Sequence, residues 1–242
     1  VELVCTMAEQ SLVRKAAAAV KEGDVGGLKA LLEADGTLAS ARLIGEDGVQ
    51  RSLLHVATDW PGNYPHVEET IKVLLLFGAD LDAACIGAKH TETALHWAAS
   101  SNDAAACKAL IEARADLEAQ GSCINGGSPL TDAIAYCNKD AAGLLIDAGA
   151  SLTHPWMAAA VGNVARMKEL IDAVEGDKKK EACYALWQAA AWNAVEPLQD
   201  CVSYGADVNW VGHDNLTPLE VAVREHASDA EAWLRANGAT ER

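Results

Sequence analysis

Three side chains are the strongest candidates for acid–base chemistry in this chain: Asp59, His90 and Asp132. Carboxylates and imidazoles are the groups that enzymes tune to donate or accept protons near neutral pH. No serine or cysteine stands in a pattern with a histidine that would indicate an activated nucleophile. Catalysis would therefore depend on these three residues alone, and we expect a binding protein more than an enzyme.

The thiols do not follow a metal-binding pattern. The chain has seven cysteines and no Cys-x-x-Cys pair, so neither a disulfide framework nor a zinc knuckle is expected, and a reducing compartment is indicated. Cys85, Cys123 and His90 would come nearest to a thiol–imidazole site, but their spacing is not that of a known ligand set. We expect no bound metal ion and no cofactor.

The charge balance narrows the choice of partner. Lys and Arg number 19 against 35 Asp and Glu, a formal net charge of −16. Nucleic acids and anionic membranes both require clustered cations, so neither is an expected partner, whereas a cationic ligand would be attracted. The sequence has no apolar run long enough to span a bilayer and no secretory signal. We expect a cytoplasmic, acidic protein in which residues 1–7 are a leader or a non-native remnant.

Three segments repeat a common pattern and predict the helices that position these residues. They are Thr93–Ala99, Ser128–Thr131 and Thr217–Val223, and in each the fourth residue is followed eighteen residues later by position 114, 149 or 238. Gly-Ala stands at the last two of these positions, and Arg-Ala-Asp begins at the first. A constant distance between a turn-like start and such a stop predicts a repeated pair of helices. No single pair can bury its own apolar face, so neighbouring pairs must stack.

These segments resemble ankyrin repeats, whose turn is Thr-Pro-Leu-His and whose stop is Gly-Ala-Asp. The resemblance extends from about residue 8 and is that of a stand-alone, degenerate domain of bacterial type. It implies an all-α solenoid of about seven helix-turn-helix units with β-hairpin fingers. The expected divisions are an N-terminal cap at 8–50, internal repeats at 51–216 and a C-terminal cap at 217–242. His55 and His96 would tie the turns together by hydrogen bonds.

The family architecture places an aromatic surface on the concave side. The lining positions follow the turn histidine by one, four and five residues. Several large or polar side chains fall there, and we predict a binding site made of Trp60, Trp97, Ser101, Asp132, Tyr136 and Trp192. Exposed Trp and Tyr are frequent anchors of protein interfaces, although large side chains filling gaps between Ala-rich helices would give the same pattern.

Two functions are consistent with the sequence. The resemblance implies a scaffold that recognises a partner protein through the concave groove. The alternative is a small-molecule binding protein or an enzyme, with an aromatic pocket between the inner helices and the fingers of repeats two to four. Asp59, Asp132 and His90 would be its polar groups, and a cationic or aromatic small ligand would suit it.

Two local departures from the pattern carry structural expectations. Arg114 stands where the family has glycine, a position that usually needs a positive φ. Trp156 follows Gly149 by only seven residues, so the finger between the fourth and fifth units is expected to be missing.

Overall fold

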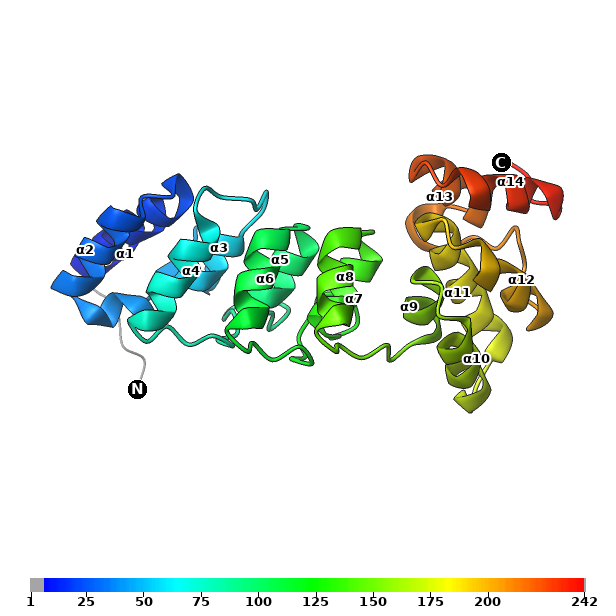
Figure 1. Ribbon diagram of the computed structural model, residues 1–242, viewed down its shortest axis with the longest axis horizontal. Helices are drawn as coiled ribbons and strands as arrows, with labels where there is room; N and C mark the ends of the chain where they lie inside the picture. The colour runs from blue at the N-terminus through cyan, green and yellow to red at the C-terminus, as the bar shows by residue number, and fades with distance from the viewer. Residues whose placement is uncertain (1–6, 242) are drawn as a thin grey trace. The chain divides into compact units, whose positions relative to one another are not determined.

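The computed structural model describes residues 7–241, and these residues form a helical protein (Figure 1). The predicted leader at 1–7 lies almost entirely outside them. The chain divides between Ser151 and Leu152 into two compact units, and each is described by itself. The prediction of one domain over 8–242 stays a prediction. In the part of the chain that the structure describes, no helix is both long and apolar enough to cross a membrane.

The first unit consists of four helix pairs, in which first helices pack on first helices and second helices on second helices. A short 3-10 helix η1 (Gly36–Ser40) follows the first pair. The pairs are α1 (Met7–Glu22) with α2 (Val25–Ala34), α3 (Leu53–Thr58) with α4 (Val67–Leu76), α5 (Ala94–Ser100) with α6 (Ala104–Glu112), and α7 (Pro129–Ala135) with α8 (Lys139–Asp147).

The second unit consists of three more pairs that pack in the same manner. A 3-10 helix η2 (His213–Asn215) precedes its last pair. The pairs are α9 (Pro155–Ala160) with α10 (Val164–Ala173), α11 (Lys178–Trp192) with α12 (Val195–Ser203), and α13 (Pro218–Arg224) with α14 (Ser228–Ala236). The described residues therefore contain seven helical pairs, as predicted.

The turn residues start the helices by the mechanism that the sequence predicts. The imidazole of His96 accepts a hydrogen bond at Nδ1 from the Thr93 N–H (3.1 Å) and donates from Nε2 to the Gly127 carbonyl (3.2 Å). His55 bonds Ser52 Oγ at 2.7 Å and the Glu92 carbonyl at 2.9 Å. His96 thus caps its own helix, His55 supports the Ser52 cap of its helix, and each histidine ties its helix to the finger of the next repeat. The structural role expected for both is confirmed.

Small side chains explain the close stacking. The inner faces of the first helices carry alanines and leucines with almost no solvent exposure, among them Leu54, Leu95, Ala98, Ala99 and Leu130. Alanine costs little side-chain entropy and lets neighbouring helices approach closely. Burial of this shared face supplies the hydrophobic stabilisation that an isolated pair lacks.

The fingers differ from the expected hairpins. Within residues 7–241 only the first finger forms paired strands, β1 (Arg42–Ile44) and β2 (Gln50–Ser52), which are antiparallel with Leu43 opposite Arg51. The second finger, residues 85–92, is closed by the Cys85 N–H and the Glu92 carbonyl at 2.9 Å. The third, residues 121–127, is made of turns. Between α8 and α9 the chain forms a short connection, as the sequence predicts.

Candidate functional site

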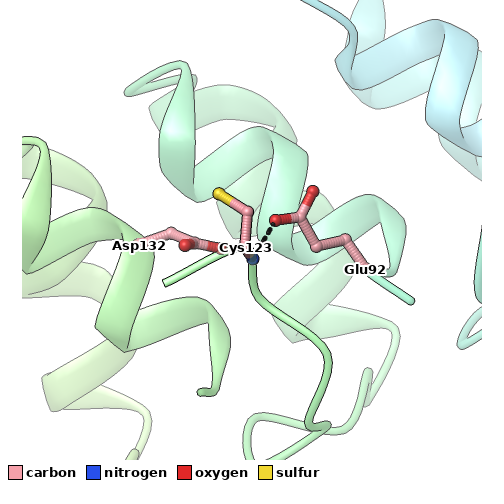
Figure 2. Close-up of side chains that lie close together, drawn as sticks. All are labelled: Glu92, Cys123 and Asp132. Carbon is pink, nitrogen blue, oxygen red and sulfur yellow. Dashed lines mark hydrogen bonds between the residues drawn. The ribbon is translucent and has the colours of Figure 1, made fainter. Parts of the chain in front are cut away.

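The second and third fingers bring a polar cluster onto α7. We call Glu92, Ser122, Cys123, Asp132 and Tyr136 the acid–thiol cluster. Figure 2 shows three of its members approaching one another from different segments of the chain. Thr91 donates its N–H to the Gly121 carbonyl at 3.1 Å, which holds the two fingers together. The cluster is therefore positioned by contacts between fingers and not by one helix alone.

Glu92 is the centre of the hydrogen bonding between the fingers. Its buried carboxylate accepts the Cys123 N–H at Oε1 (2.8 Å) and the Trp97 indole N–H at Oε2 (2.9 Å). His90 Nδ1 lies 3.0 Å from the same Oε2. Oε2 thus serves two neighbours, whereas Oε1 accepts from Cys123 and has a second lone pair that can bind another group.

Asp132 is buried with one oxygen unsatisfied. Its residue exposure is 1%, Ser122 Oγ is hydrogen-bonded to Oδ1, and Oδ2 has no hydrogen-bond partner among the described residues. Burial raises the pKa of this carboxyl to about 7, against the opposing effect of the Ser122 hydrogen bond and with a further increase from the charge of Glu92. The sequence placed Asp132 on an open surface; instead the third finger covers it.

Cys123 and Tyr136 form the exposed edge of the cluster. The Cys123 Sγ lies 3.5 Å from the Tyr136 hydroxyl, and both residues are solvent-exposed. Desolvation raises the pKa of the Cys123 thiol, and the hydrogen bond with Cys123 raises the pKa of Tyr136. A thiol with a raised pKa is mostly protonated at neutral pH, which does not favour nucleophilic chemistry.

The same side chains are suited to metal coordination. One ligand atom from each of Glu92, Cys123 and Asp132 lies within 4.8 Å of the others. Thiolate and carboxylate are both ligands of divalent transition metals. The sequence offered one thiol–imidazole candidate, made of Cys85, Cys123 and His90. Of this set, the structure pairs Cys85 with His90, whose Sγ and Nδ1 atoms lie 3.7 Å apart.

The aromatic residues of the predicted groove differ in their solvent exposure. Trp60 is 78% exposed and Tyr136 49% exposed. Trp97 is half-buried, because its ring packs edge-on against His55 (4.9 Å between ring centroids) and lies 5.6 Å from the Arg51 guanidinium. Trp60 and Tyr136 are thus the accessible anchors, and Trp97 is largely engaged within the protein.

The remaining residues of the predicted site do not belong to the acid–thiol cluster. Asp59 forms an ion pair with Lys21 at 3.7 Å. Ser101 is half-buried at the end of α5. Trp192 closes α11 in the second unit and is described with that unit alone. Of the acid–base candidates, His90 and Asp132 both lie near Glu92, and Asp59 has its own partner.

Sequence reasoning missed Glu92 and Ser122. Glu92 directly precedes the turn residue Thr93, and it is buried where it accepts hydrogen bonds from Cys123 of the third finger and Trp97 of α5. A glutamate at the end of a finger has no distinctive sequence pattern. Its role is visible only from the residues that surround it in the structure. The cysteine and the histidine of the two fingers were the visible signal that these loops approach each other.

Comparison with known proteins identifies the repeat. Residues 54–155 match the family model of ankyrin repeats in three copies. A search of curated proteins gave no match. Among solved structures, the crystal structure of the human ASB11 ankyrin repeat domain is similar, with a TM-score of 0.53 and 21% sequence identity over 94% of this chain and 99% of that one. This similarity shows a shared fold.

Proposed function

Because this chain is an ankyrin-repeat protein, we propose that it recognises a partner protein through the first unit, with Trp60 and Tyr136 as its anchors. Ankyrin repeats are general modules of protein–protein interaction. Fold alone does not select a surface, so the proposal depends on which side chains this chain exposes.

The observation that carries the proposal is the exposure of two large aromatics at equivalent positions of the repeat. Trp60 follows His55 by five residues, and Tyr136 follows Thr131 by five. Tyr136 is the C-cap of the first helix α7, and Trp60 lies in the turn directly after the C-cap of the first helix α3, with Ser101 at the end of α5 between them in the stacking order. Rigid aromatic side chains are enriched among the residues that dominate binding energy.

The charge of the chain favours a partner with a basic surface. The net charge is −16, and complementary potentials accelerate encounter and exclude like-charged competitors. Exposed aromatic side chains on an acidic protein would bind a partner surface that combines apolar and cationic side chains.

Affinity purification with matched variants tests this proposal. Trp60→Ala and Tyr136→Ala should each weaken binding of the captured partner by about tenfold or more. Leu76→Ala is the control, because Leu76 is 77% exposed but belongs to the second helix α4.

The proposal fails if both aromatic variants capture the partner as well as the unmodified chain does. It fails equally if Leu76→Ala reduces capture to the same extent, since the loss would then follow from any exposed apolar residue.

A further inference from the structure

We propose that Glu92, Cys123 and Asp132 bind a zinc ion between the second and third fingers. This inference goes beyond partner recognition, since it concerns a site that a small ion would occupy with no partner present. It differs from the expectation drawn from the sequence, which was that no metal is bound.

The donor atoms are close enough to converge on one ion. The three ligand atoms lie within 4.8 Å of one another. In tetrahedral zinc sites, metal–oxygen distances of ~2.1 Å and a metal–sulfur distance of ~2.3 Å place ligand atoms roughly 3.5 Å apart. A contraction of about 1 Å would therefore suffice, and the exposed Cys123 side chain at the edge of a loop can supply the part that involves its sulfur.

The orphan oxygen of Asp132 indicates a missing ligand. Its Oδ2 is buried and has no hydrogen-bond partner among the described residues, and buried polar atoms are almost always satisfied. Asp132 itself belongs to the same group of donors as Glu92 and Cys123. A cation held by the three residues would satisfy it.

The mixed donor set selects the cation. Calcium and magnesium take oxygen ligands, and a thiol would be a poor donor to either. Zinc accepts thiolate and carboxylate together. A partner's lysine is a weaker candidate, because the orphan oxygen has no exposed surface for an ammonium group to reach.

The surrounding hydrogen bonds support the ligands in a zinc site. Glu92 Oε2 is held by Trp97 and His90, whereas Oε1 accepts the Cys123 N–H and has a second lone pair for the metal. The indole and imidazole would orient this carboxylate, as outer-shell partners do in zinc proteins. Coordination would release to solvent the Cys123 thiol proton and any proton held by the Asp132 carboxyl, and a water molecule would complete the fourth position.

Zinc titration of the chelator-treated full chain tests this site, with isothermal calorimetry for affinity and cobalt substitution for ligand identity. We expect one zinc per chain, a rise in melting temperature with zinc, and a thiolate-to-cobalt charge-transfer band. Cys123→Ser and Asp132→Asn should each weaken zinc binding by about tenfold or more. Cys137→Ser and Asp140→Asn are the matched thiol and carboxylate controls and should bind as the unmodified chain does.

The proposal is overturned if zinc does not bind, if the cobalt form lacks the thiolate band, or if the Cys123 and Asp132 variants retain full affinity. Full affinity in Asp132→Asn alone would mean that Asp132 serves only as the hydrogen-bond partner of Ser122, which also overturns the three-residue site. Circular dichroism of each variant separates loss of binding from loss of fold, and Cys123 is exposed, so its replacement leaves the core intact.

Discussion

At the scale of single residues, the repeat dictates the backbone conformation even where the side chain departs from the family. Arg114 has a φ of 72°, so the position that the family fills with glycine is left-handed here too. A side chain in this region costs about 1 kcal/mol relative to glycine. The conformation was predictable because it belongs to the repeat, whereas the choice of arginine has no structural explanation here.

Replacing Arg114 by glycine should therefore leave stability unchanged or raise it by about 1 kcal/mol. The Arg114 side chain is exposed, so little packing is lost. Urea unfolding followed by circular dichroism measures the change. Lys108→Gly on the exposed face of α6 is the control and should lose about 1 kcal/mol. A clear loss of stability in Arg114→Gly would mean that the arginine makes a stabilising contact.

His55 makes stability depend on pH. Burial lowers the pKa of this imidazole to about 4, although its bond to the Glu92 carbonyl acts in the opposite direction. The unfolded chain takes up the proton near pH 6.5. The histidine's contribution is therefore complete above about pH 6.5 and is lost progressively as the pH falls towards 4.

Between pH 7 and pH 4.5 this linkage should lower the free energy of unfolding by about 2 kcal/mol. His55→Gln removes the titrating group, so the acid-induced loss should be smaller in the variant by a similar amount. Chemical denaturation at the two pH values measures both. Equal losses in the two proteins would show that His55 titrates normally in the folded state.

At the scale of elements, helices and their starts were predictable, and the paths of the loops were not. The helices follow from apolar spacing and capping residues within one repeat. The loop at 59–66 contains two prolines, which favour a turn over a helix, but nothing in the sequence shows its anchor. Asn63 donates its N–H to Asp103 Oδ2 at 2.6 Å, and the same carboxylate caps α6 through Ala106. This contact joins residues forty positions apart.

The candidate site shows the same limit. Glu92 and Cys123 are separated by 31 positions and meet because two fingers pack together. Periodicity describes what each repeat shares, whereas these fingers differ from the family and from each other. The sequence therefore placed Tyr136 and Trp60 on the surface, and it missed that Asp132 is covered and that Glu92 is its neighbour.

At the scale of the whole molecule, the division of the chain coincides with its missing finger. The two compact units separate between Ser151 and Leu152, within the short connection from α8 to α9. Elsewhere in the first unit, fingers add hydrogen bonds between successive repeats, as between residues 91 and 121. Within the first unit, the fingers therefore reinforce the stacking of successive repeats.

The acidity of the entire chain predicts how binding will respond to salt. A net charge of −16 attracts a basic partner over distances longer than a contact, and salt screens this attraction beyond a Debye length of about 10 Å at 0.1 M. Raising the ionic strength from about 0.05 M to 0.5 M should slow association by roughly tenfold and change dissociation much less, because dissociation depends on the anchors in contact. Surface plasmon resonance with the captured partner measures both rates. The Tyr136→Ala substitution should instead speed dissociation and leave association nearly unchanged, because it removes an anchor and not a charge. An association rate that is independent of salt would show that the partner is not recognised by charge, and the aromatic side chains alone would then have to account for selectivity.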